Sequence, residues 1–141
     1  MQNRRVSRAN VDVVRSSFEA LARGDFDQAF TVYAPEAEWH TADDEPDCET
    51  YVGIPALRAL MDQLAEPWTN RFDDRVAFER FVDCGDWVVV PWRARLHGKG
   101  SGIDIELYET YAVLVTDGRI RRVEEYRTVE QALEAAGGPV Q

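Results

Sequence analysis

The chain has 141 residues, of which 45% are hydrophobic and 30% are charged, a composition typical of a folded globular protein. This length suits a single domain over residues 1–141. The net charge of −10 disfavours a nucleic-acid partner, because an acidic surface repels phosphate groups. The apolar stretches are shorter than the roughly 20 residues of a membrane span, and no apolar segment follows the basic N-terminal residues. We therefore expect a cytoplasmic protein without a membrane partner.

The cysteines and histidines lack the spacing of a metal or redox site. Cys48 and Cys84 form no CxxC pair, and His40 and His97 lie far apart in the sequence. We therefore expect no metal and no cofactor. We also expect both cysteines to be free thiols, because a cytoplasmic compartment disfavours disulfides.

Two helices are predicted at the start of the chain. Residues 10–25 place apolar side chains on one helical stripe. Asp25 and Gln28 resemble a capping box, which predicts a second, short helix over residues 25–33. Pro35 closes that helix.

A short strand and an acidic loop come next. Alternation over residues 36–41 puts Trp39 and Thr41 on one face of the strand and His40 on the other. The loop over residues 42–53 is rich in Asp, Glu, Pro and Gly. It fits either a binding loop or a solvated surface excursion.

Helices are also predicted in the middle and at the end of the chain. Residues 54–68 carry an apolar stripe that ends at Pro67, and its members are Leu57, Leu60, Met61 and Leu64. The C-terminal segment 128–138 begins with a capping box formed by Thr128 and Gln131.

The second half of the chain predicts a meander of four antiparallel strands, over residues 71–87, 87–97, 103–115 and 120–127. Pro91 lacks an N–H donor, which favours a sheet edge or a bulge. The last strand alternates poorly, so its register is open. The fold class is α+β: a curved antiparallel sheet with three helices across one face, a cone-shaped cavity between them, and a short C-terminal helix.

A carboxylate interrupts the apolar face of the strand over residues 103–115. Glu109 falls among side chains that alternation directs inward, namely Ile103, Ile105, Leu107, Tyr111, Val113 and Val115. A buried carboxylate loses hydration, which suits it to general acid or base catalysis near neutral pH. Arg80 interrupts the apolar face of the preceding strand, so a structural ion pair between Glu109 and Arg80 is the alternative. The two interpretations are compatible.

The order of elements resembles the nuclear transport factor 2-like superfamily, in its SnoaL-like branch. The matching stretches are FEALARGDFDQAFTVYAPEAEWH, YVGIPALRALM and TDGRIRRVEEYRTVEQALEAAG. The resemblance implies a deep, mostly apolar pocket between sheet and helices, and frequent dimerisation through the outer face of the sheet. It leaves the function open, because members include isomerases, polyketide cyclases, dehydratases, epoxide hydrolases, ligand carriers and adaptor domains.

The chemistries of that superfamily match this chain only in part. The ketosteroid isomerase branch has a tyrosine on the first helix, and the matching position of this chain is Ser17. That branch also has an aspartate base at the end of the first strand, where this chain has Thr41. Its second acid lies near the position that matches Glu109. The epoxide hydrolases use an Asp-Arg-Asp group, for which Glu109, Arg80 and Glu125 are the matching types. The face that Glu125 occupies is undecided from the sequence.

Aromatic side chains are predicted to shape the pocket. Trp39, Trp92 and Tyr111 fall on apolar faces, where core and pocket wall are partly the same surface. Trp68 follows the third helix, and we expect it at the cavity mouth. His40 has the wrong parity to point inward with Trp39, and it is a secondary acid–base candidate.

These observations favour a cofactor-free enzyme that moves a proton on a small, mostly apolar molecule, with Glu109 as acid or base. The reaction would be an isomerisation, cyclisation, dehydration or epoxide opening. The alternatives are a non-catalytic pocket protein that binds such a molecule and a dimeric interaction domain. The outer sheet face is expected to form a homodimer through residues that include Val89, Tyr108 and Leu114.

Overall fold

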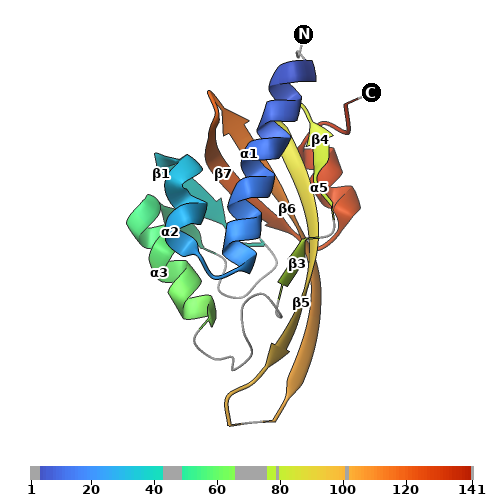
Figure 1. Ribbon diagram of the computed structural model, residues 1–141. Helices are drawn as coiled ribbons and strands as arrows, with labels where there is room; N and C mark the ends of the chain where they lie inside the picture. The colour runs from blue at the N-terminus through green and yellow to red at the C-terminus, as the bar shows by residue number, and fades with distance from the viewer. Residues whose placement is uncertain (1–3, 43–48, 66–75, 79, 101, 141) are drawn as a thin grey trace.

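The computed structural model describes residues 4–42, 49–65, 76–78, 80–100 and 102–140 (Figure 1). In chain order the elements are α1 (Arg4–Ala22), α2 (Phe26–Ala29), the 3-10 helix η1 (Phe30–Val32), β1 (Tyr33–His40), β2 (Thr50–Val52), α3 (Ile54–Ala65), β3 (Val76–Phe78), β4 (Val82–Cys84), β5 (Trp87–His97), β6 (Asp104–Thr116), β7 (Arg119–Tyr126) and α5 (Val129–Ala135). None of the described helices is long and apolar enough to cross a membrane.

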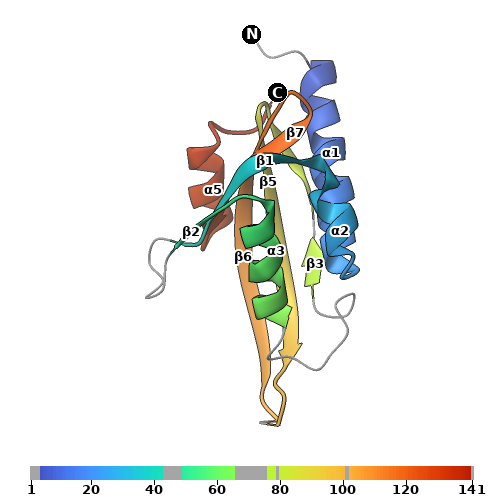
Figure 2. The same cartoon turned by 90° about the vertical axis from the view of Figure 1, so that its left-hand side faces the viewer.

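The strands form a single curved sheet in the order β2-β1-β7-β6-β5-β3, with β4 also paired to β5. Helices α1 and α2 lie on one side of this sheet and α5 lies on the other (Figures 1 and 2). The α+β class with N-terminal helices and a short C-terminal helix is therefore confirmed. The pairing of β1 with β7 is parallel, whereas the other pairings are antiparallel. The sequence had indicated antiparallel strands throughout.

The main core lies between α1 and the inner face of the sheet. The helical stripe buries Val14, Phe18 and Leu21, and the sheet contributes apolar side chains such as Val113 and Val123. Each fully buried side chain of this size stabilises the fold by about 1.5–3 kcal/mol.

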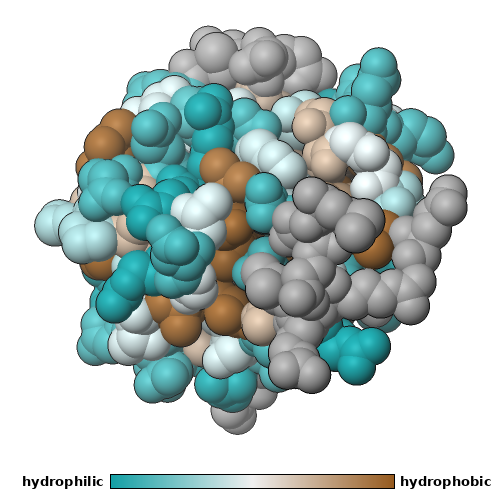
Figure 3. All heavy atoms as spheres, turned by 90° about the horizontal axis from the view of Figure 1, so that it is seen from above, coloured by the Kyte–Doolittle hydropathy of each residue, from teal (hydrophilic) through white to brown (hydrophobic). Residues whose placement is uncertain are grey.

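The face of the molecule seen from above is largely hydrophilic, with a narrow apolar strip near its centre (Figure 3).

The second helix is shorter than predicted. Asp25 caps α2 by accepting a hydrogen bond from the Gln28 backbone N–H at 3.3 Å, as the capping pattern indicates. The chain leaves the helix through η1 and is already extended at Tyr33, which opens β1. Pro35 accounts only for the residue before it, Ala34, in which it disfavours helical geometry. The capping box of Thr128 and Gln131 at α5 is present as predicted.

Pro91 marks a break in the outer part of the sheet. On the side of β5 away from β6, β3 pairs with residues 92–94 and β4 pairs with residues 87–89. Pro91 falls between these two pairings, where its missing N–H breaks no ladder. The single strand predicted over residues 71–87 is therefore two short strands, and Arg80 lies in the gap between them with an exposed side chain. Residues 71–75 lie outside the described residues.

The paired arms of β5 and β6 extend beyond the helices (Figures 1 and 2). This explains why alternation overestimates burial on β6: Ile105 and Leu107 are each 37% exposed and Ile103 is 58% exposed. Inward parity leads to burial only where a helix covers the sheet.

Helix α5 covers part of the outer sheet face. It packs on a small apolar cluster in which Val89 is fully buried, together with Cys84, Ala112, Ala132 and Ala136. The sequence had suggested that Val89 forms part of an exposed dimer surface. Its burial under α5 shows that it does not. Burial, with a smaller contribution from the Asp83 carboxylate, raises the pKa of the free Cys84 thiol to about 11, so this thiol stays protonated at neutral pH.

Candidate functional site

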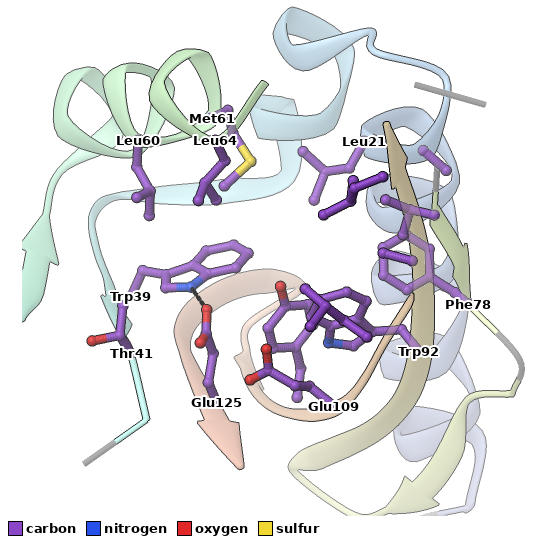
Figure 4. Close-up of a pocket in the computed structure, with 16 residues that line it drawn as sticks. Leu21, Trp39, Thr41, Leu60, Met61, Leu64, Phe78, Trp92, Glu109 and Glu125 are labelled. Atoms are coloured by element: carbon purple, nitrogen blue, oxygen red, sulfur yellow. Dashed lines mark hydrogen bonds between the residues drawn. The ribbon is translucent and has the colours of Figure 1, made fainter. Parts of the chain in front are cut away.

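A cavity of about 230 Å³ lies between the inner sheet face and the helices α1 and α3 (Figure 4). Its lining is mostly apolar and consists of Leu21, Ala22, Trp39, Thr41, Leu60, Met61, Leu64, Val76, Phe78, Trp92, Ala94, Leu96, Leu107, Glu109, Tyr111 and Glu125. For comparison, an engineered cavity of about 150 Å³ with an apolar lining stays dry and binds benzene. The inner cavity, as we call it from here on, therefore suits a small apolar molecule.

Three aromatic rings that the sequence placed on the apolar face form one wall of the inner cavity. The ring centroids of Trp39 and Tyr111 are 5.2 Å apart at an interplanar angle of 77°, and those of Trp92 and Tyr111 are 5.3 Å apart at 28°. Phe18 on α1 packs edge-on against Tyr111 from behind, with centroids 5.7 Å apart. These contacts fix the ring orientations, so the wall is preformed.

Glu109 lies on the inward face of β6, as alternation predicts, and it lines the inner cavity. Its side chain is 11% exposed, and Oε2 lies 3.9 Å from Nη1 of Arg127, which follows β7. The expected pairing with Arg80 is wrong, because Arg80 sits exposed in the gap between β3 and β4. The strand break opposite Pro91 removes the alternation on which that pairing depended.

Glu125 also faces the inner cavity, which resolves the side that the sequence left undecided. It lies opposite Tyr111 in the β6–β7 register, and Oε1 accepts a hydrogen bond of 3.1 Å from Nε1 of Trp39. Glu109 is its diagonal neighbour on the same face, a relation that sets residues roughly 7–8 Å apart. The inner cavity thus holds two carboxylates on an apolar wall.

Trp92 differs from Trp39 in the state of its indole nitrogen. Nε1 of Trp92 is buried and has no hydrogen-bond partner among the described residues. Trp92 is paired with Glu109 in the β5–β6 register, so the two residues are direct cross-strand neighbours.

His40 and Thr41 lie at the end of β1. The His40 ring belongs to the outer face, where Nε2 lies 2.9 Å from Oε1 of Glu38 and Nδ1 lies 3.1 Å from Oγ1 of Thr50. This agrees with the parity predicted for His40 and keeps it out of the inner cavity. Thr41 lines the inner cavity and also exchanges hydrogen bonds with the backbone of Glu49. Trp68, predicted at the cavity mouth, lies outside the described residues.

A second cavity of about 410 Å³ opens on the outer side of β1 and β7. We call it the outer cavity, and it is lined by His40, Thr41, Ala42, Arg122, Glu124, Glu125, Tyr126, Arg127 and Gln131. Glu124 accepts hydrogen bonds of 3.0 Å from both Nε of Arg122 and the hydroxyl of Tyr126. The lining of the outer cavity is therefore charged, and Glu124, Arg122 and Tyr126 bind one another within it.

The tyrosine role of the ketosteroid isomerase branch is unfilled at Ser17. The Ser17 hydroxyl is buried and donates a hydrogen bond of 2.9 Å to the backbone carbonyl of Ala29, which joins α1 to α2.

Within the described ranges, no group of three or more His, Cys, Asp and Glu side chains is placed to hold a metal ion.

Sequence reasoning missed Arg127 as the partner of Glu109. A signal was available in the hairpin turn at residues 117–118, from which the β6–β7 pairing can be counted. That count places Tyr126 opposite Glu109, and a register irregularity between Leu114 and Val115 shifts the pairing by one residue. Arg127 is found only when the irregularity is known.

The curved sheet with its covering helices defines a protein of the nuclear transport factor 2-like superfamily. A sequence model of the SnoaL-like domain matches residues 14–123, and the chain belongs to this family. A comparison with curated protein sequences gives no match.

Solved structures agree with this assignment. An NTF2-like protein from Burkholderia xenovorans LB400 has 25% sequence identity and a TM-score of 0.69, over 92% of this chain and 96% of that one. A putative SnoaL-like polyketide cyclase from Jannaschia sp. CCS1 has 18% identity and a TM-score of 0.72, over 94% of each chain. A protein of ketosteroid isomerase-like fold from Catenulispora acidiphila DSM 44928, in complex with trimethylamine, has 15% identity and a TM-score of 0.68, over 91% of this chain and 94% of that one.

Proposed function

We propose that this protein is a cofactor-independent enzyme that performs acid–base catalysis on a small, mostly apolar organic molecule held in the inner cavity. The observation that carries the proposal is the position of Glu109, a carboxylate 11% exposed on a mostly apolar wall. Such a group can give or take a proton beside a bound molecule from which water is excluded. Membership of the SnoaL-like family supports this class of function.

The roles follow from the geometry. Glu109 is the acid or base, and Arg127 holds its carboxylate in place from the rim with an Oε2–Nη1 distance of 3.9 Å. Trp39, Trp92 and Tyr111 provide the shape of the site. His40 takes no part, because its ring is held on the outer face by Glu38.

The reaction class is an isomerisation, cyclisation, dehydration or epoxide opening, each of which involves proton transfer at carbon or oxygen. The similarity to a putative polyketide cyclase supports cyclisation. Epoxide opening is favoured by a different observation: Glu109, Arg127 and Glu125 bring two carboxylates and an arginine together where the C-terminal end of β7 meets the middle of β6.

A test uses two bicyclic probes, 1-indanone for proton abstraction and indene oxide for epoxide opening. Deuterium uptake by 1-indanone in D₂O and diol formation from indene oxide are followed by NMR, with wild-type protein and with Glu109→Gln. We expect the wild-type protein to accelerate one of the two reactions and Glu109→Gln to lower that rate about 10²–10⁴-fold. Equal rates in the two proteins would contradict the role of Glu109.

A second function, non-catalytic binding of the same class of molecule, is favoured by the partners of the two carboxylates. Glu125 accepts the Trp39 indole N–H and Glu109 lies beside Arg127, as expected for groups with a structural role. Probe binding without any acceleration by the wild-type protein would support this function over catalysis.

We also propose that the protein works as a homodimer in the cytoplasm. Tyr108, which is 62% exposed on the outer side of β6, supports an interface on the part of that face that α5 leaves uncovered. Light scattering at micromolar concentration should then give twice the chain mass of 16.1 kDa. A mass equal to that of one chain would contradict the dimer.

A further inference from the structure

The inward face of β6 runs from the inside of the inner cavity to the outside of the molecule. In order along this face come Tyr111, Glu109, Leu107, Ile105 and, just before the strand, Ile103. Tyr111 is 8% exposed and the side chain of Glu109 is 11% exposed. Beyond them, Leu107 and Ile105 are each 37% exposed and Ile103 is 58% exposed. The first three residues line the inner cavity, so its mouth lies at Leu107, and an apolar strip of Ile105 and Ile103 continues outside it.

This strip is continuous with the wall of the inner cavity. Leu96 lines the cavity and is paired with Ile105 in the β5–β6 register. Directly paired side chains have Cβ atoms roughly 4.5–5.5 Å apart, so Ile105 extends the apolar surface of the wall onto the arm.

Helix α3 forms the other side of the mouth. Leu64, near the end of that helix, lines the inner cavity and is 50% exposed. It lies across the cavity from Glu109 (Figure 4). The cavity thus opens between Leu64 and Leu107, towards the arms of β5 and β6 that extend beyond the helices (Figure 2).

The dimensions of the strip indicate what it holds. Four residues of strand separate Leu107 from Ile103, a length of about 14 Å. A stable protein interface buries roughly 800 Å² on each partner, which three partly exposed side chains cannot supply. The net charge of −10 also disfavours an anionic lipid surface. A single apolar chain that leaves the cavity matches the strip in both width and direction.

The order of side chains along β6 also places the parts of such a molecule. The deep end of the inner cavity is aromatic, with Trp39 and Tyr111 packed at a centroid distance of 5.2 Å, and it suits a ring. The cavity volume of about 230 Å³, against the roughly 150 Å³ that suffices for benzene, leaves room for one or two rings. Glu109 comes between this aromatic end and the mouth at Leu107, so it lies where a ring and a chain would join.

We propose that the substrate consists of a head of one or two rings and an unbranched apolar tail. The head occupies the inner cavity, the reacting group at the junction lies beside Glu109, and the tail leaves past Leu107 to lie on Ile105 and Ile103. This inference rests on the proposed use of the inner cavity as the substrate site. It makes Ile105, which lies outside the cavity, a residue that determines specificity for chain length.

The test uses three phenyl ketones that differ only in their unbranched chain: acetophenone, hexanophenone and octanophenone. Binding to the full chain is followed by quenching of tryptophan emission, since Trp39 and Trp92 line the inner cavity. In the wild-type protein the affinity should rise about 2- to 4-fold for each added CH₂ group, according to how fully the group is buried. A tail that ended in water would add nothing.

Two matched variants locate the tail. Ile105→Thr removes apolar surface from the strip but keeps a β-branched side chain in the strand. It should weaken octanophenone binding about 3- to 10-fold, the worth of a few tens of Å² of apolar contact, and leave acetophenone binding unchanged. The control is Val52→Thr, because Val52 is 58% exposed on β2 at the opposite edge of the sheet and lines neither cavity. All three ketones should bind this variant as they bind the wild-type protein.

The methyl resonances of Ile105 give an independent measurement on the wild-type protein. We expect a nuclear Overhauser contact between these methyl groups and the terminal methyl group of octanophenone, and no contact with acetophenone. Octanophenone bound without this contact would contradict the proposed path of the tail.

Four binding results would overturn the inference. They are wild-type affinity that does not rise with chain length, octanophenone binding that Ile105→Thr leaves unchanged, an equal loss for acetophenone in that variant, and an equal loss in Val52→Thr. These readouts need no turnover, so Glu109 can fail as a catalyst while the tail still binds the strip. Acetophenone binding without any gain from a longer chain would remove the tail and leave the proposed catalysis standing. If none of the ketones binds, the inner cavity does not hold this class of molecule and the inference falls.

Discussion

The two cavities of this protein lie on opposite faces of the same strands and differ in how they treat charge. The inner cavity, of about 230 Å³, is walled by apolar and aromatic side chains with two carboxylates among them. The outer cavity, of about 410 Å³, is lined largely by charged and polar side chains that pair with one another. Thr41 and Glu125 contribute to both. The comparison separates a surface built for solvation from one that holds its polar groups in an apolar environment.

Adjacent residues of β7 show the difference most directly. Glu124 faces outward and accepts hydrogen bonds from Arg122 and Tyr126, in a setting where water can replace either partner. Glu125 faces inward, where its partner is the indole N–H of the fully buried Trp39. A polar contact on the inner side is therefore worth more than a similar one on the outer side, because its loss leaves a buried group unsatisfied.

The largest expected effect separates the two tryptophans of the inner wall. Trp39 is 1% exposed, so Trp39→Ala should lower the free energy of unfolding by about 3–5 kcal/mol through lost burial and a residual cavity. Trp92 is only partly buried, so Trp92→Ala should cost less. Urea unfolding of the two variants measures both values. Equal losses would mean that Trp92 belongs to the core as fully as Trp39.

A smaller effect is expected from the neighbouring carboxylates of β7. Glu125→Ala should cost about 1–3 kcal/mol of unfolding free energy, because it leaves the Trp39 N–H buried without this acceptor. Glu124→Ala makes the same chemical change one residue away. Its partner Arg122 has a side chain 40% exposed and can return to water, so a cost of at most about 1 kcal/mol is expected. If urea unfolding gives the reverse order, the inner and outer faces of β7 are wrongly assigned.

The sequence predicted which side chains of β1 and β6 line the inner cavity, but it left the side of Glu125 on β7 undecided. The inward positions of Glu109, Trp39 and Tyr111 follow from simple alternation, which holds wherever a strand is long and regular. Glu125 did not follow, because Arg121 is an extra residue of β7 where the register shifts between Ile120 and Arg122. That bulge reverses the parity of everything after it, so a count from the turn would place Glu125 on the outer face.

Arg80 failed as a predicted partner for a related reason. Alternation was extended along residues 71–87 as if they were one strand. The strand is interrupted opposite Pro91, between β3 and β4, and Arg80 is exposed there. Contacts between distant segments, such as Trp39 with Glu125, depend on the parallel pairing of β1 with β7, which no local pattern specifies. Local periodicity therefore predicts which face a side chain takes, and tertiary pairing decides its partner.

The smallest expected effect concerns Arg127, which lies at the boundary between the two cavities. Its side chain is 44% exposed and its Nη1 lies 3.9 Å from Oε2 of Glu109, a distance longer than a good hydrogen bond. Because water screens an ion pair of this kind, Arg127→Ala should change the free energy of unfolding by no more than about 1 kcal/mol. The same substitution should disturb the proposed chemistry more than the fold, since Arg127 helps to keep the Glu109 carboxylate in position. Urea unfolding and the deuterium-uptake assay with 1-indanone measure the two effects on one variant. A loss of several kcal/mol in Arg127→Ala would instead identify Glu109 and Arg127 as a structural pair, and would weaken the case for Glu109 as an acid or base.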